Sequence, residues 1–538
     1  MGSDTRLQRY IFFVFLRFPK NNDMKRFLLL CCLVALTWPL LAQNADQANP
    51  DLNLNAAYLP PTDPAVQAKL AQWQDLKFGM LIHWGIYAVP GIVESWSICS
   101  EDEDWIPRDS NMRYDEYKRW YWNLNKMFNP QQFDPDQWAD AAKKAGMKYV
   151  VFTTKHHDGF AMYDTKFSDY SIAKGPFAGN PKADVAKYVF DAFRRQGMMV
   201  GAYYSKPDWH SQDYWWDRYA TPDRHVNYKI ENHPYRWERY KEFVFNQIDE
   251  ITSHYGEIDI LWLDGGWVRA PKEDIGMDRI AKKARENQPG MIIVDRTVTG
   301  KYENYRTPEK MVPDKQLSYP WETCMPLSKD WGFVPGAIFK SPDVIISTLI
   351  EVVAKGGSLL LGVGPTPEGI IEPEVAKILD EIGNWLKANG EAIYNTRNTP
   401  VYHDGNVWFT ASNDKLTTYA IVRPDGPLPA TVSWHGNLPA KGSKMVLLAD
   451  HSVVKYKISG DSVIVTVPKS VRAKGKPFAV AFQTSSNFSY NDLNRNGKCD
   501  PYENPNLSVN ERVEDLLSKM TLEEKVGQMA MTMGWEYY

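Results

Sequence analysis

The sequence has little cysteine and little excess charge. Only 5 of its 538 residues are cysteines, and Cys31 and Cys32 lie in an apolar N-terminal run. The others, Cys99, Cys324 and Cys499, are sparse and odd in number, which argues against a disulfide scaffold and against a cysteine-rich zinc site. The formal net charge is -4, so no basic surface for nucleic acid is predicted.

Long hydrophobic runs are also scarce. One run covers residues 27–41; it follows Met24-Lys25-Arg26 and ends in Ala42-Gln43. A short basic region, a short apolar region and a small residue predict a secretory signal peptide, and the run is short for a membrane-spanning helix. We expect residues 1–42 to be an early start plus this signal, and the protein to be periplasmic or extracellular. An uncleaved anchor is the alternative.

Aromatic side chains are abundant. The chain has 20 Trp and 29 Tyr. Aromatic faces can stack on the apolar faces of sugar rings, although a large aromatic core explains part of the excess. The composition therefore suits a carbohydrate-binding protein.

Strand-like and helix-like patterns alternate between residues 64 and 397, after a polar linker at residues 43–63. The expected strands cover residues 78–82, 148–153, 198–204, 258–263, 291–294 and 358–361, and the expected helices cover residues 134–145, 182–196, 235–255 and 374–389. This alternation predicts an α/β fold of the (β/α)8-like TIM barrel type. The first strand is followed by no glycine-rich dinucleotide loop, which disfavours a doubly wound sheet.

The pattern changes after the barrel. Residues 398–485 contain short strands separated by Gly, Pro, Asn and Asp, which predicts an antiparallel β-sandwich. Residues 486–538 form a tail with an amphipathic helix expected at residues 509–529. The tail also matches a calcium-loop pattern, with a polar turn as the alternative; its candidate ligands are Asp492, Asn494, Asn496, Asp500 and Glu503.

Polar and aromatic residues follow the predicted barrel strands, at the end where barrel enzymes keep their catalytic groups. The apolar run 258–263 leads directly into Asp264-Gly265-Gly266-Trp267. On this segment alone, a capping aspartate and a catalytic aspartate are equally good interpretations. The full set includes a carboxylate pair, which glycoside hydrolysis requires. Its members are His83, Trp84, His156, His157, Asp158, Tyr203, Trp209, Asp264, Trp267, Arg296, Trp321 and Glu322.

A metal-dependent hydrolase is the competing enzyme class. His83, His156, His157 and Asp264 are residue types that bind zinc. Adjacent histidines on an extended chain are expected to point in opposite directions, which argues against a shared metal ion.

Several ordered segments resemble the signature blocks of α-L-fucosidases, glycoside hydrolase family 29. They are residues 77–85, 153–160, 261–267, 321–324 and 359–369, and the resemblance covers about residues 65–485. It implies an exo-acting, retaining enzyme that hydrolyses terminal α-L-fucosides of glycans and needs no cofactor. A non-catalytic fucose-binding protein is the alternative, although both candidate carboxylates are present.

The resemblance also implies residue roles. Asp264 matches the nucleophile. Glu322 is our preferred acid/base, because the neighbouring Trp321 offers an apolar wall that raises a carboxyl pKa; Glu309 is the alternative. The expected substrate-binding residues are His83, Trp96, His156, His157, Tyr203, Trp209, Trp267, Arg296 and Trp321.

The tail resembles a different family. Residues 492–503 and 506–529 are similar to the N-terminal opening of family 3 β-glycosidases. The match contains no catalytic residue, so no activity is predicted for the tail.

Overall fold

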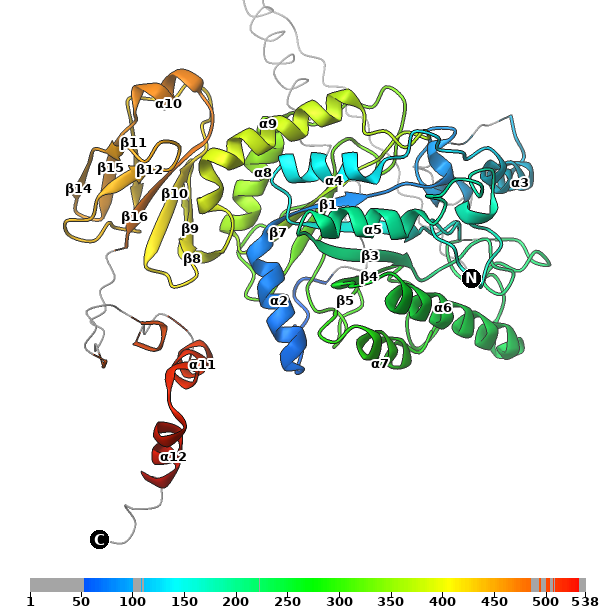
Figure 1. The fold of residues 1–538 in the computed structure, drawn as a ribbon. Coiled ribbons are helices and arrows are strands. Elements are labelled where there is room, and N and C mark those ends of the chain that lie inside the picture. Colours follow the sequence, from blue (N-terminus) through cyan, green and yellow to red (C-terminus); the bar gives the residue numbers. More distant parts are fainter. Residues whose placement is uncertain are drawn as a thin grey trace, which may run out of the picture. The chain divides into compact units, whose positions relative to one another are not determined.

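The computed structural model describes residues 53–99, 108, 111–221, 223–484, 493–494, 500–503, 507 and 509–531 (Figure 1). The predicted signal peptide lies outside these residues, as do Asp492 and Asn496 of the calcium-loop pattern. Among the helices described, none combines the length and the apolar character needed to cross a membrane.

The core of the larger region is a sheet of seven parallel strands, which confirms the barrel prediction with one strand fewer than eight. The spatial order is β5-β4-β3-β2-β1-β7-β6. The strands are almost continuously buried, as expected where both faces of a parallel sheet are covered. Their bounds are β1 (Phe78–Ile82), β2 (Tyr149–Lys155), β3 (Met199–Ser205), β4 (Ile260–Asp264), β5 (Ile292–Asp295), β6 (Glu322–Pro326) and β7 (Ser358–Val363).

An irregular segment lies where an eighth strand would close the barrel. Within the described residues no ladder joins β5 to β6. Residues 303–309 make isolated bridges instead, from Glu303 to Val294 on β5 and from Glu309 to Cys324 on β6. The segment therefore carries Glu309 along the edge of β6 without being a strand.

Helices surround the parallel sheet (Figure 1). They are α2 (Pro64–Leu76), α4 (Pro135–Lys144), α5 (Val185–Arg195), α6 (Pro234–His254), α7 (Met277–Asn287), α8 (Pro342–Ala354) and α9 (Pro373–Asn389). A further helix, α3 (Tyr114–Trp122), lies away from the strands. Asp63, Asp134 and Ser341 cap α2, α4 and α8 by accepting hydrogen bonds from first-turn amides, each just before a proline.

The N-terminal ends of the barrel strands are closed. Trp73 of α2 stacks on Tyr305 with ring centroids 4.0 Å apart and meets Tyr149 edge-on. Arg306 is fully buried and donates hydrogen bonds to the carbonyl groups of Asn53, Leu54 and Ala56. The described residues therefore close this end of the barrel, and we expect a substrate to approach from the C-terminal ends of the strands.

The sandwich prediction is confirmed. A six-stranded sheet has the order β13-β12-β16-β10-β9-β8 and a three-stranded sheet has the order β11-β15-β14. Trp434 is fully buried in the core between them. The strands are β8 (Thr396–Asp404), β9 (Val407–Ser412), β10 (Thr417–Val422), β11 (Thr431–His435), β12 (Met445–Leu447), β13 (Val453–Val454), β14 (Tyr456–Ser459), β15 (Ser462–Thr466) and β16 (Phe478–Gln483).

Strand β8 was not predicted. It lies at the edge of its sheet, and its register shifts between Asn398 and His403. Pro400 lies inside this shift, and proline is tolerated in edge strands and irregularities of this kind. The mixed burial of β8 leaves no alternation for sequence reasoning to detect.

In the described part of the tail, the amphipathic stretch expected at residues 509–529 is helical, but it is divided into two helices, α11 (Val509–Lys519) and α12 (Leu522–Met531). Thr521 and Glu524 form a capping box: the Thr521 hydroxyl accepts from the Glu524 amide, and the Glu524 carboxylate accepts from the Thr521 amide. This pair starts a second helix where the amphipathic pattern seemed continuous.

Candidate active site

Asp264 is the last residue of β4, at the open end of the barrel. Gly265 has φ 85°, and a Cβ there would lie 2.2 Å from Pro207. A Cβ on Gly266 would lie 1.9 Å from Oγ1 of Thr297. Only glycine allows the chain to leave the strand so sharply. The Asp264 side chain stays 16% exposed at the end of an otherwise buried strand.

The surroundings of Asp264 keep it ionised. Burial alone would raise its pKa, but the Arg296 guanidinium and the Tyr203 hydroxyl outweigh burial and hold the pKa well below its usual range. Nη1 of Arg296 lies 2.7 Å from Oδ1, and the Tyr203 hydroxyl lies 2.6 Å from Oδ2. An ionised carboxylate held in place by two donors is what a nucleophile requires.

Arg296 joins Asp264 to Glu309. Its Nη2 lies 2.9 Å from Oε2 of Glu309, and its guanidinium lies 4.3 Å from the ring centre of Trp262. The two carboxylates are therefore separated by one planar guanidinium. The residues that follow, Thr297 and Lys310, have left-handed φ angles of 60° and 55°. Such backbone strain is common at functional sites.

Trp331 contacts Glu309 from the other side, and sequence reasoning missed it. Its Nε1 lies 3.3 Å from Oε1 of Glu309, and its ring stacks on His83 with centroids 5.2 Å apart. The Glu309 side chain is 21% exposed. Trp331 lies in the loop after β6. The expectation that residues in the loops after the barrel strands form the site would therefore have included it.

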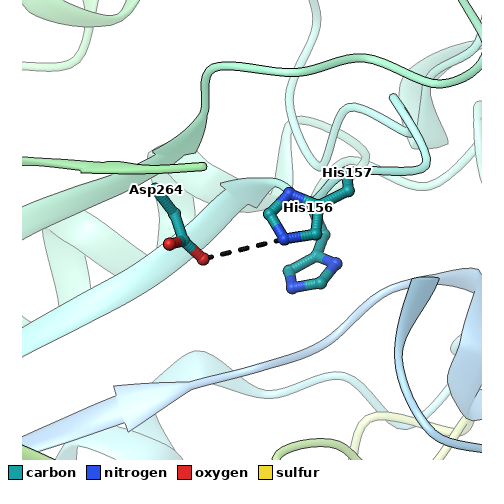
Figure 2. A group of neighbouring side chains, drawn as sticks. All are labelled: His156, His157 and Asp264. Carbon is teal, nitrogen blue, oxygen red and sulfur yellow. Dashed lines mark ion pairs between the residues drawn. The ribbon is translucent and has the colours of Figure 1, made fainter. Parts of the chain in front are cut away.

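His156 and His157 lie side by side next to Asp264 (Figure 2). Their ring centroids are 4.3 Å apart, and Nε2 of His157 lies 3.8 Å from Oδ2 of Asp264. The expectation that the two rings point in opposite directions was wrong. Strand β2 ends at Lys155, and the chain then turns, with the Gly159 amide donating to the His156 carbonyl. One ligand atom from each of the three side chains would lie within 4.8 Å of the others, so spacing alone does not argue against a metal ion.

The histidines are neutral. Burial lowers the pKa of His156 to about 4 and holds the pKa values of His83 and His157 well below their usual range. Nδ1 of His83 is buried and has no hydrogen-bond partner among the described residues. Neutral imidazoles can donate to or accept from sugar hydroxyls, and the unpaired nitrogen is available for such a contact.

Tryptophans form a wall next to these rings. The ring centroids of Trp96, Trp209 and Trp267 lie 5.3, 5.1 and 5.2 Å from that of His157. The structure thus brings most of the predicted site residues together: His83, Trp96, His156, His157, Tyr203, Trp209, Asp264, Trp267, Arg296 and Glu309.

Glu322 and Trp321 do not join this group. Glu322 is the first residue of β6 and pairs in register with Ser358, the first residue of β7. Its carboxyl group accepts hydrogen bonds from Tyr149 (2.6 Å), Trp262 (3.2 Å) and Tyr305 (3.5 Å) and has no exposed area. Burial raises its pKa to about 7, the direction expected of an acid, but at the closed end of the barrel. The Trp321 ring is also buried, packed against Gly357.

Comparison with known proteins gives one family. A sequence model described as alpha-L-fucosidase matches residues 45–391. The chain belongs to the alpha-L-fucosidase family. The predictions of a glycoside hydrolase and of an α-L-fucosidase are therefore confirmed, over a metal-dependent hydrolase and a non-catalytic sugar-binding protein.

Individual relatives agree with this family. The alpha-L-fucosidase of Branchiostoma floridae is 28% identical over 432 residues, which cover 76% of this chain and 92% of the relative. The human plasma alpha-L-fucosidase is 29% identical over 386 residues, which cover 68% of this chain and 79% of the relative. Alpha-L-fucosidase isoenzyme 1 of Paenibacillus thiaminolyticus has a similar structure, with a TM-score of 0.66, 29% identity, and coverage of 78% of this chain and all of the other.

Proposed function

We propose that this fucosidase releases terminal α-linked L-fucose from fucosylated glycans with retention of configuration, with Asp264 as the nucleophile and Glu309 as the acid/base. The observation that carries this assignment is the shared guanidinium of Arg296, which binds both carboxylates at the open end of the barrel. Glu309 replaces Glu322, our first choice from the sequence, because Glu322 lies at the closed end.

Asp264 would attack the anomeric carbon and form a fucosyl ester while Glu309 gives its proton to the leaving oxygen. Glu309 would then take a proton from water as that water attacks the ester. In the first step the negative charge leaves Asp264 and appears on Glu309, on the other side of Arg296. The guanidinium thus has one ionised carboxylate partner before and after each step, which avoids leaving a buried charge unpaired.

The tryptophan wall supports the substrate class. Trp96, Trp209 and Trp267 offer apolar faces next to the neutral histidines. Fucose has an apolar face with a methyl group and a polar edge with hydroxyl groups. The site has matching apolar and hydrogen-bonding surfaces.

The decisive experiment is hydrolysis of an aryl α-L-fucoside, followed by NMR before the product mutarotates. Retention predicts that α-L-fucose appears first. An Asp264→Gly variant supplied with azide is expected to form β-fucosyl azide, because azide takes the place of the missing carboxylate. Initial release of β-L-fucose, or undiminished turnover by the Asp264 variant, would rule out this mechanism.

We also propose export from the cytoplasm, on the basis of the basic and apolar segments before Gln43. N-terminal sequencing of the protein from cell fractions would test it. The expected result is a chain beginning at about residue 43 in the periplasm or medium. A cytoplasmic chain that retains residues 24–42 would contradict it.

A further inference from the structure

The serines behind the two adjacent histidines define the protonation of each ring. Nδ1 of His157 lies 2.7 Å from Oγ of Ser205, at the end of β3. Nδ1 of His156 lies 2.5 Å from Oγ of Ser95. Both serines are fully buried. A hydroxyl group has one proton and two acceptor positions, so the remaining bonds of each serine show whether it donates to the ring or accepts from it.

The Ser205 hydroxyl oxygen accepts a hydrogen bond from Nδ1 of His157. Its Oγ lies 2.7 Å from the carbonyl oxygen of Pro207, which can only accept. The single hydroxyl proton is used in that bond, so the short contact to His157 requires a proton on Nδ1. A neutral ring then has an unprotonated Nε2. This is the nitrogen that faces Oδ2 of Asp264 at 3.8 Å.

The Ser95 hydroxyl group donates a hydrogen bond to Nδ1 of His156. The backbone amide of Asp158 already donates to its Oγ at 3.0 Å. The hydroxyl proton has no acceptor among the described residues other than Nδ1 of His156. If that nitrogen also donated, a buried hydroxyl proton would remain unpaired, at a cost of about 1–3 kcal/mol. Nδ1 of His156 is therefore unprotonated, and Nε2 carries the proton.

We infer that Ser95 and Ser205 are positioning residues that hold His156 and His157 in opposite tautomers, so that His156 donates to the substrate and His157 accepts from a substrate hydroxyl. The role of the rings in sugar binding rests on the proposed function, whereas the tautomers themselves do not. The lowered pKa values of both rings keep them neutral, which the assignment requires.

The assignment also explains the gap next to Asp264. An unprotonated Nε2 of His157 and an ionised Asp264 are both acceptors, and 3.8 Å is too long for a direct hydrogen bond. A hydroxyl group placed between them can donate to His157 and remain close to the nucleophile. Thus the pair discriminates a sugar with a hydroxyl group at this position from one that lacks it.

Nuclear magnetic resonance of protein labelled with ¹⁵N-histidine tests this in the ligand-free enzyme. Two-bond ¹⁵N–¹H correlations distinguish the tautomers, and single His→Gln variants assign the rings among the 10 histidines. The expected result is Nε2–H for His156 and Nδ1–H for His157. Finding the same tautomer in both rings would overturn the inference. Because no substrate is used, that result would leave the proposed activity untouched.

A Ser205→Ala variant isolates the cause. With its acceptor removed, His157 is expected to shift toward the Nε2–H tautomer, because a proton on Nε2 faces the ionised carboxylate of Asp264. The value of kcat/KM is then expected to fall about 10- to 100-fold. Ser205→Thr, which keeps the hydroxyl group, should restore the Nδ1–H tautomer. Retention of Nδ1–H by a folded Ser205→Ala protein would show that the serine does not set the tautomer.

Thr154→Val is the matched control. Thr154 is a buried hydroxyl residue on the adjacent strand, and its hydroxyl group donates a hydrogen bond to the Tyr203 carbonyl rather than to either histidine. Its removal should leave both tautomers unchanged. A tautomer shift in this variant equal to that in Ser205→Ala would mean that loss of any buried hydroxyl group disturbs the rings, and would contradict a specific role for Ser205.

Discussion

The two ends of the barrel each hold a carboxyl group among hydrogen-bond donors, but only one end is suited to catalysis. At the open end Asp264 faces a guanidinium, and its pKa is held well below the usual range. At the closed end Glu322 accepts hydrogen bonds from hydroxyl and indole groups, and burial raises its pKa to about 7. The nature of the donors thus decides the charge of each carboxyl group.

Access separates the two ends further. Trp73, Tyr305 and Arg306 close the end at which Glu322 lies. Glycines and loops leave part of Asp264 and Glu309 exposed at the other end. A raised pKa is therefore not sufficient to identify a catalytic acid, because Glu322 has a raised pKa but lies where it cannot contact a substrate.

The largest effect is expected from loss of Asp264. Asp264→Ala should lower kcat on an aryl α-L-fucoside on the order of 10⁴-fold or more, because the covalent step is lost. Thermal unfolding and binding of fucose would show that the variant remains folded. A decrease in kcat of less than tenfold would contradict the assignment of the open end as the catalytic end.

Comparison of the glutamates is the next test. Glu309→Ala should slow hydrolysis of a fucosyl disaccharide by about 10²–10⁴-fold, but should affect an aryl fucoside with an acidic phenol much less, since such a leaving group needs no proton. Glu322→Gln is the control and should keep the same ratio between the two substrates as the native enzyme. A leaving-group effect in Glu322→Gln instead would restore our first assignment.

Arg296 links the two open-end carboxylates and should control the titration of Asp264. Arg296→Lys keeps a charge but cannot bind both groups in one plane, so kcat/KM should fall about 100-fold. Since Arg296 lowers the Asp264 pKa, the acidic limb of the kcat/KM profile should move to higher pH. Tyr203→Phe, which removes one hydrogen bond to Asp264, should move the limb in the same direction by less. If the acidic limb of the kcat/KM profile stayed at the same pH in both variants, control of the Asp264 pKa by Arg296 and Tyr203 would be contradicted.

The smallest effect on activity is expected from Glu322→Gln, below about fivefold, because only a buried contact changes. Its stability should respond to pH. The folded-state pKa of Glu322, about 7, lies above that of an unfolded glutamate, so native stability falls as pH rises from about 4.5 through about 7. Glutamine cannot ionise, so the variant should lose less stability over this range, by up to about 3 kcal/mol. If the free energy of unfolding changed equally with pH in the native enzyme and in Glu322→Gln, the raised pKa of Glu322 would be contradicted.

Much of the molecule followed from the sequence. The alternation of strand and helix patterns predicted the barrel, and the polar residues at successive strand ends predicted the open-end site, because parallel strands bring their C-terminal ends together. Short strands and turn residues predicted the sandwich. Both are local patterns that need no knowledge of distant contacts.

Only the tertiary structure separated Glu309 from Glu322. Glu309 lies in an irregular segment between β5 and β6, which has no periodicity to predict its position. Glu322 opens its strand, whereas Asp264 ends its own, so the two lie at opposite ends of the same sheet. A sequence specifies which residues are buried and charged, but strand register and the closure of one barrel end decide which carboxyl groups meet a substrate.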